Sequence, residues 1–423
     1  MIKFELFENR REISVFLIVV GLVFILNLLY QYYEFSKFTD KKFQFLEAKV
    51  EHSYIKTKNS KTYRVLKLRN KEFSFYTITG KDSDIKRYDR LSLGVITDNV
   101  TYKEYLKKNF YMSSFDVEKL ENSSNFKDFL VEAIVSQHTN LKIKELYATL
   151  YLATPISKEL RADVTKWGIA HVVSISGFHL GIIFSTIFLF ITPVYRFFQK
   201  RFFPYRSSYF DIATLAFFLM VIYLFLLDFT PSFLRSLVMA FLGFLFLIKN
   251  IRILSFYTLF LTIILTVCIF PSFLFSIGFY FSCLGVFYIY LYIHHWGDFR
   301  EVLGFKKIVW HAVWLNIYVY LAMNIPVYHF FPTLAFSQVA VIPVGYIFVL
   351  FYPLSAILHL FGLGYLMDFM LLKFLDFEVV TYQTEIPNYL FWMMNLLLIP
   401  AIRYKFIAIF LALIGIIPLF YIV

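Results

Sequence analysis

The stretch from residue 167 to residue 184, WGIAHVVSISGFHLGIIF, places polar side chains that can carry chemistry directly before an unbroken apolar run. His179 is a potential general base and Ser176 a potential nucleophile, the two groups that covalent acyl transfer requires. No acidic residue stands nearby in the sequence to orient the histidine. The other interpretation is that Gly177 permits close helix approach or a break in the helix, and that the polar groups face a cavity or a partner helix.

Arg235 is the second unusual residue, because it stands inside an apolar stretch that begins near residue 232. A central arginine costs about 2.5–3.5 kcal/mol on membrane-insertion scales, so it needs a partner or water. Two interpretations are open. The side chain reaches the outer interface and pairs with Asp228, or it contacts a phosphate in a pore.

The apolar composition indicates which elements must position these residues. Apolar residues make up 59% of the 423 residues and charged residues 17%, which excludes an ordinary soluble enzyme. The sequence predicts a polytopic α-helical membrane protein with roughly ten spans, each needing about 20 apolar residues. The expected spans lie at about 14–32, 171–195, 209–228, 232–249, 253–270, 272–293, 309–328, 336–360, 387–401 and 404–422. Segment 361–375 is either a further span or a helix lying in the headgroup region.

The basic residues of the short loops predict the orientation. Lys3, Arg10 and Arg11 precede the first span, so the N-terminus is expected in the cytoplasm and the chain in the cytoplasmic (inner) membrane. The first apolar run is long and no small-residue cleavage site follows it. We therefore interpret residues 1–33 as a cytoplasmic N-terminus with an uncleaved first transmembrane helix.

Residues 34–112 form a polar segment that is expected to fold outside the membrane. Short stretches of alternating apolar and polar residues, separated by polar breaks such as TKNS, predict a small β-barrel. From Lys37 to Lys108 there are 18 basic and nine acidic residues, a net charge of +9 out of +12 for the whole chain. Residues 113–170 then change to a helical pattern and are expected at the membrane surface.

A basic barrel with interleaved aromatic residues has the composition of a surface that binds nucleic acid. Cations neutralise phosphates, and rings stack on bases. The candidates for DNA binding in this domain are Lys56, Arg64, Arg69, Phe73, Phe75 and Tyr76. The alternative is a solvated basic surface close to anionic lipid headgroups.

Several other chemistries have no sequence support. Cys268 and Cys283 are the only cysteines and both lie in apolar stretches, so we expect no disulfide framework and no metal site. No Walker pattern occurs, and no cofactor is expected.

The run HVVSISGFHLGII resembles the signature H-L-L-A-I-S-G-L-H-V of the ComEC family of competence proteins, which carry transforming DNA across the cytoplasmic membrane. The matching residues are His171, Ile175, Ser176, Gly177 and His179, whereas Ser174 and Phe178 depart from the signature.

Two further motifs follow in the same order as in that family. PSFLRSLVM resembles P-x-x-x-R-A-x-x-M through Pro231, Arg235 and Met239. PSFLFSIGFYFS resembles P-x-x-L-x-D-x-G-F-Q-L-S and keeps Pro271, Leu274, Gly278, Phe279 and Ser282, while Ser276, Tyr280 and Phe281 depart from the pattern.

The resemblance implies an OB-like extracytoplasmic domain and a competence-type helical bundle at residues 171–423 that conducts single-stranded DNA. Many family members end in a metallo-β-lactamase-like domain. The pattern H-x-H-x-D-H does not occur here, and His294, His295 and Asp298 have the wrong spacing. We therefore expect a short form without that domain, whose nuclease is another polypeptide.

The leading hypothesis is thus a DNA channel that performs no covalent chemistry. The alternative is a membrane enzyme of envelope glycan or lipid-linked phosphate assembly that uses His179 and Arg235; a small-solute transporter would not need the basic domain. The residues expected nearest the DNA path are Ser174, Ser176, Gly177, His179, Arg235, Ser282, Asn316 and Asn324. Expected partners are single-stranded DNA, membrane lipid, a separate DNA receptor, a nuclease and a cytoplasmic motor or strand-binding protein, and a homo-oligomer remains open.

Overall fold

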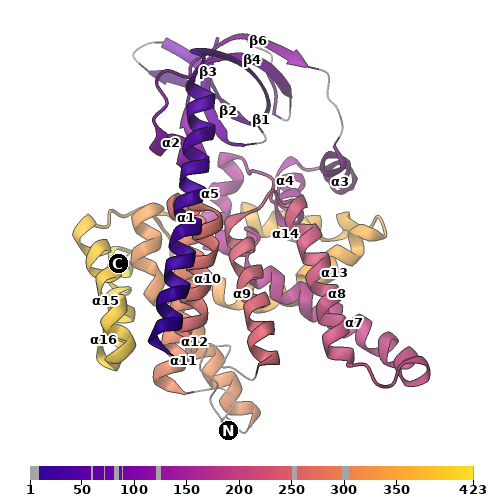
Figure 1. Cartoon of the computed structure of the whole chain (residues 1–423). Coiled ribbons are helices and arrows are strands. Elements are labelled where there is room, and N and C mark those ends of the chain that lie inside the picture. The colour runs from indigo at the N-terminus through magenta and orange to yellow at the C-terminus, as the bar shows by residue number, and fades with distance from the viewer. Residues whose placement is uncertain are drawn as a thin grey trace. The chain divides into compact units, whose positions relative to one another are not determined.

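The computed structural model describes residues 9–58, 61–70, 72–80, 85–87, 89–120, 125–249, 255–297 and 304–422. The contacts divide the chain into two compact units, which we describe separately (Figure 1). The β unit comprises the described residues of 4–130 and 263–277. The helical unit comprises those of 131–262 and 278–423.

Six strands form the sheet of the β unit, in the order β5-β3-β2-β1-β4-β6. Their bounds are β1 (Phe43–Lys58), β2 (Lys61–Arg69), β3 (Ser74–Thr79), β4 (Arg90–Ile96), β5 (Asn109–Tyr111) and β6 (Ser114–Leu120). β3 and β5 pair in parallel, and the other pairings are antiparallel. The pairings leave an open sheet, so the closed barrel expected from the sequence is not formed by them.

Alternation along the strands places one apolar face in the core of the β unit. Leu66 and Leu68 of β2 are fully buried, as is Phe75 of the neighbouring β3. Successive residues of a strand point to opposite faces, so these side chains share one face of the sheet. The short helix α2 (Tyr102–Lys107) and the end of α1 (Arg10–Thr39) cover this core, with Phe35 and Phe38 packed against it.

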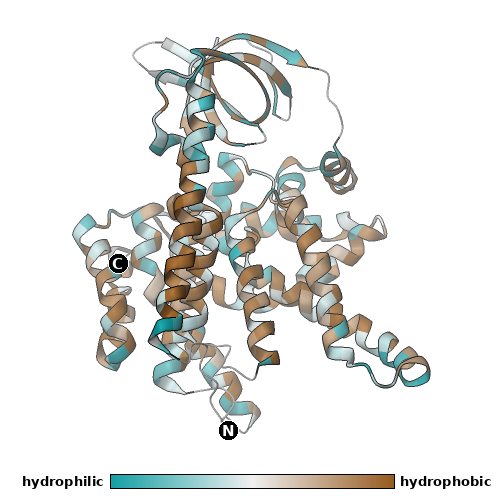
Figure 2. Ribbon diagram, in the orientation of Figure 1, coloured by the Kyte–Doolittle hydropathy of each residue, from teal (hydrophilic) through white to brown (hydrophobic). Residues whose placement is uncertain are grey.

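The helix α1 belongs to the β unit and is mostly apolar, and its C-terminal end packs against the core of the sheet. Figure 2 shows hydrophobic residues along most of its length. Its one central amide, Asn27, donates to the carbonyl oxygens of Cys268 at 3.0 Å and Ile269 at 2.6 Å. These carbonyls end α10 (Phe256–Ile269), where the last turn of a helix leaves acceptors without intrahelical partners. The amide is thereby satisfied inside an apolar environment.

The helical unit consists of helices joined by short turns. Its main elements are α3 (Phe126–Val135), α4 (Leu141–Leu152), α5 (Lys158–Lys166), α6 (Ala170–Val173), α7 (Gly177–Phe202), α8 (Ser208–Leu226), α9 (Pro231–Ile248), α11 (Ile277–Trp296), α12 (Phe305–Phe330), α13 (Val341–Leu360), α14 (Asp368–Asp376), α15 (Asn388–Arg403) and α16 (Lys405–Ile414). Short 3-10 turns, including η1 (Pro271–Phe275) in the β unit and η4 (Gly364–Met367), connect some of them, and β7 (Thr333–Leu334) pairs with β8 (Tyr382–Gln383).

Within the described residues, seven helices are long and apolar enough to cross a membrane, which establishes a mostly helical, multi-pass chain. They are α1, α7, α8, α9, α11, α12 and α13. The expected spans near 253–270, 387–401 and 404–422 form shorter helices, so the count of ten stays a prediction. Segment 361–375 yields the nine-residue α14, and nine residues rise only about 14 Å, roughly half of the hydrocarbon thickness.

Candidate functional site

The first polar turn of α7 is fixed by a reciprocal capping arrangement. Ser176 is the N-cap, and its side-chain oxygen accepts from the Phe178 amide at 3.3 Å. His179 Nδ1 accepts from the Ser176 amide at 3.3 Å. Two of the amides that a helix start leaves unpaired are thus satisfied. The imidazole acts here on the backbone of Ser176, and not on its hydroxyl as a catalytic base would.

His179 is also completely buried, between aromatic rings of α13. Its ring centroid lies 5.2 Å from that of Phe348 and 5.0 Å from that of Tyr352, both in edge-to-face geometry. Since Nδ1 accepts a hydrogen bond, the neutral ring carries its proton on Nε2. This placement favours a role for His179 in joining α7 to α13.

Gly177 brings α7 unusually close to α9. A Cβ atom added at Gly177 would lie 2.6 Å from Ser236 Oγ and 3.4 Å from Arg235 Nη2. Only glycine fits such an approach without displacing a neighbour. Ser232 adds a second link, because its hydroxyl donates to the carbonyl of Ile175 at 2.6 Å.

Arg235 lies at the centre of this contact and is 3% exposed. Its Nε donates to Ser282 Oγ at 2.8 Å, and its Nη2 donates to Ser236 Oγ at 2.7 Å. The Met239 sulfur lies 3.3 Å from Nη1. Every one of these partners is electrically neutral. Asp228 is not among these partners, so the contacts of Arg235 do not support the interpretation in which it pairs with Asp228.

The geometry therefore joins three segments that are far apart in the sequence. Gly177 starts α7, Arg235 belongs to α9 and Ser282 belongs to α11. Residues 153–422 match the family model described as Competence protein. This chain belongs to the ComEC-type family of competence proteins. No curated protein and no solved structure gives a significant match.

Each of the three segments holds one of the competence motifs noted in the sequence, and the fold gathers the motifs around one guanidinium. The remaining candidates of the helical unit lie elsewhere or act locally. Ser174 is exposed after α6. Asn316 is exposed and donates to Ala312 O and Tyr346 Oη. Asn324 is buried and donates to the Gly415 carbonyl at 2.9 Å, which ties α12 to the end of α16.

Two residues of this competence protein escaped the sequence reasoning. Ser232 and Ser236 supply the hydroxyls that link α9 to the start of α7 and to Arg235. The sequence spacing could have identified them, because two serines four residues apart, one before and one after Arg235, lie on the same face of a helix.

In the β unit, the polar candidates are accessible to different degrees. Lys56 is exposed, and Tyr76 is half-buried. Arg69 is exposed but lies 3.6 Å from the Glu51 carboxylate. Arg64 is half-buried, with Nη1 donating to Ser53 Oγ at 3.1 Å. Lys56 is thus the predicted cation best placed to meet a phosphate.

Phe73 and Phe75 require a correction. They are 4% and 0% exposed and belong to the core of the β unit. Their ring centroids lie 6.0 Å apart, in edge-to-face packing. Rings in this position are not available to stack on bases, so the role expected from the sequence does not fit either residue.

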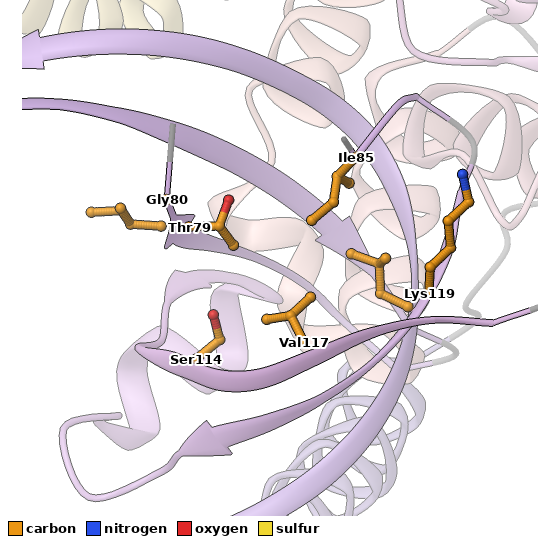
Figure 3. Close-up of a pocket in the computed structure, with 8 residues that line it drawn as sticks. Thr79, Gly80, Ile85, Ser114, Val117 and Lys119 are labelled. Carbon is orange, nitrogen blue, oxygen red and sulfur yellow. The ribbon is translucent and has the colours of Figure 1, made fainter. Parts of the chain in front are cut away.

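A hollow of about 770 Å³ opens in the β unit between β3 and β6 (Figure 3). Ile85, Leu91 and Val117 line it with apolar side chains, and Ser114 and Lys119 contribute polar atoms. The Lys119 ammonium is paired with Asp89 at 2.9 Å. Burial lowers the pKa of Lys108, another cation of this unit.

Proposed function

We propose that this protein is a channel that moves single-stranded transforming DNA across the cytoplasmic membrane. The observation that carries the proposal is Arg235, a buried guanidinium with neutral partners, at the meeting point of three motifs in a competence-family chain. A cation left without a carboxylate inside an apolar bundle is an attractive contact for an anion. The repeating anion of a DNA strand is phosphate.

The donor geometry of Arg235 fits this role. A guanidinium has five N–H groups in a planar fork that suits phosphate oxygens. The contacts to Ser282, Ser236 and Met239 occupy three of them. Arg235 is buried in this structure. We therefore propose that the structure represents a closed state of the channel, and that a DNA strand reaches the guanidinium when α7, α9 and α11 separate.

The direct test compares two routes of DNA entry in a deletion strain. Entry of radiolabelled DNA into the cytoplasm is expected to be lost, whereas transformation by electroporation is retained, because electroporation bypasses the channel. Unchanged entry of labelled DNA in the deletion strain would contradict the proposal.

We propose that the β unit receives DNA on the outside and functions as an OB-like module. β1 pairs with both β2 and β4, and the two sheet edges, β5 and β6, follow each other closely in the chain. The segment Asn109–Leu120 thus contacts β3 with its first part and β4 with its second. That arrangement supports a partly open barrel of the kind that binds single strands.

The contribution of Lys56 can be measured through salt dependence. In the full-length protein in nanodiscs, Lys56→Gln is expected to make the slope of log affinity for single-stranded DNA against log salt shallower by about 0.7, the value for one lost phosphate contact. The matched control is Lys42→Gln, which removes the same charge from a lysine already paired with Asp98 at 3.1 Å. An equal change in both variants would mean that only net charge matters.

The proposed orientation places the β unit outside and the loop before α8 in the cytoplasm. Ser60, in the polar segment expected outside, would be a reporter from the sequence alone, but it lies outside the described residues, so we choose the exposed Glu118 of β6. In a background without Cys268 and Cys283, an impermeant thiol reagent added to whole cells should label Glu118→Cys and not Ser207→Cys. The reverse pattern would overturn the orientation.

A substitution at His179 distinguishes the channel hypothesis from the enzyme hypothesis. His179→Asn is expected to retain most DNA uptake per inserted protein, because loss of one cap interaction costs about 1 kcal/mol. A catalytic base would lose about 10²–10⁴-fold at unchanged abundance. That larger loss would support the enzyme hypothesis and contradict the capping role.

A further inference from the structure

A second polar cluster lies in the helical unit, away from Arg235, and none of the sequence motifs includes it. His138 precedes α4, His359 lies in the last turn of α13 and Asp368 begins α14. His138 Nδ1 lies 2.9 and 3.1 Å from the two Asp368 carboxylate oxygens. His138 Nε2 lies 3.0 Å from His359 Nε2, and His359 Nδ1 lies 2.7 Å from the Ser355 carbonyl oxygen.

These four distances fix the number of protons in the cluster. The Ser355 carbonyl can only accept, so His359 Nδ1 carries a proton. If Asp368 is ionised, His138 Nδ1 carries a proton as well. With both rings neutral, the two Nε2 lone pairs would then face each other at 3.0 Å, which is repulsive. One additional proton removes the repulsion by forming an N–H···N hydrogen bond of ordinary length.

The alternative arrangement of protons leads to the same count. A protonated Asp368 would donate to His138 Nδ1, and His138 Nε2 would then carry a proton and donate to His359 Nε2. In both arrangements the carboxylate and the two imidazoles together hold one proton more than an ionised carboxylate with two neutral rings, and the cluster is electrically neutral.

The surroundings are built to keep this proton. The His138 side chain is fully buried, and that of Asp368 is 16% exposed. The ring of Tyr147 stacks on His138 at 4.6 Å and meets His359 edge-on at 4.5 Å. Gly364 leaves the space that the pair needs, since a Cβ there would lie 2.7 Å from His359 Nε2.

The other titratable groups around the pair are tyrosines and one distant ion-pair network. From α4, Tyr151 lies edge-on to His359, and its hydroxyl hydrogen-bonds Ser355 Oγ. From α13, Tyr352 packs against Tyr151. Lys142 and Asp376, on α4 and α14, pair with each other at 2.8 Å, which raises the pKa of Lys142. Asp368 is therefore the carboxylate that acts on the histidine pair within the described part of the chain.

We infer that Asp368, His138 and His359 form a binding site for one labile proton, which fastens the turn before α4 to α13 and α14. Gln137 supports the same junction, donating to the His359 carbonyl and accepting from the Gly364 amide, both at 3.0 Å. Above the ordinary histidine pKa of about 6.5, the folded state holds a proton that the unfolded state has lost, so this connection weakens as the pH rises further. A divalent metal between the two Nε2 atoms is the competing explanation, but no group of three or more His, Cys, Asp or Glu side chains among the described residues is arranged so that it could hold a metal ion.

The test is nitrogen-15 NMR on histidine-labelled, full-length protein in nanodiscs. A coupling through the hydrogen bond between the Nε2 atoms of His138 and His359 is expected at mildly acidic pH and is lost at alkaline pH. No coupling at acidic pH would overturn the inference, whether stoichiometric metal is found in the protein or not.

Thermal unfolding against pH gives an independent readout. The wild-type midpoint should fall across the pH range in which the coupling disappears. His359→Gln should lose this dependence, because the amide N–H can donate to His138 Nε2 without an extra proton. His329→Gln, at a histidine stacked on Phe391 elsewhere in the helical unit, should keep the wild-type dependence. Equal pH dependence in wild type and His359→Gln would contradict the inference.

Discussion

Replacing Gly177 with leucine is expected to lower DNA uptake by about 100-fold or more while the protein still inserts in the membrane. The new side chain would overlap Ser236, whose hydroxyl accepts from Arg235 and donates to the Ser232 carbonyl. Overpacking typically costs about 1–3 kcal/mol, and 100-fold corresponds to about 2.7 kcal/mol. The measurement is uptake of labelled DNA per unit of inserted protein.

Gly181 provides the matched control on the same helix. A Cβ at Gly181 has no neighbouring atom within 4 Å, so Gly181→Leu should retain near-normal uptake despite the same change in composition. If both variants lose uptake equally, the effect comes from the helix as a whole. If Gly177→Leu is tolerated, the close approach of α7 to α9 is not needed for transport.

The class of the fold could be predicted from the sequence, because apolar runs long enough to cross a membrane rarely form any other structure. The long helices α7, α8 and α9 occur close to where hydropathy predicts them. The ends of the shorter helices were harder to predict, because hydropathy measures apolar content and does not indicate the residue at which a helix ends. Residues 387–401 were expected to form a span, and α15 occupies nearly the same residues, but its 16 residues are fewer than the about 20 that a span needs.

The wrong assignment of Phe73 and Phe75 has a simple cause. Alternation tells which residues share a face of a strand, but it does not tell which face is buried. Aromatic residues two positions apart fit a core as well as a binding surface. Here the helix α1 determines which face is buried, because Phe38 of α1 packs edge-on against Phe73.

The spacing of the polar residues in the sequence could not predict which of them come together in the folded protein. Gly177, Arg235 and Ser282 lie on three helices, and only the order of the motifs suggested that they belong together. His138 and His359 are 221 residues apart, so no local pattern could have paired them. Buried polar residues that satisfy one another across helices require the tertiary structure.

Replacing Arg235 with methionine is expected to separate function from stability. Uptake should fall by about 10- to 100-fold, in line with the 1.5–3 kcal/mol of a hydrogen bond to a charged group. Stability should be unchanged or higher, because a charge buried without an ion-pair partner costs free energy that an apolar methionine of similar length does not cost. The two measurements are uptake per inserted protein and the thermal midpoint of the purified protein.

Ser282→Ala is the control for the hydrogen-bonding environment of Arg235. It removes the acceptor of Nε–H but keeps the charge, so uptake should fall by only about fivefold, the equivalent of about 1 kcal/mol for one hydrogen bond. A structural arginine gives a different pattern, in which Arg235→Met lowers the thermal midpoint and abundance while uptake per inserted protein stays normal. A destabilised and fully active Arg235→Met protein would therefore exclude Arg235 as a contact for DNA.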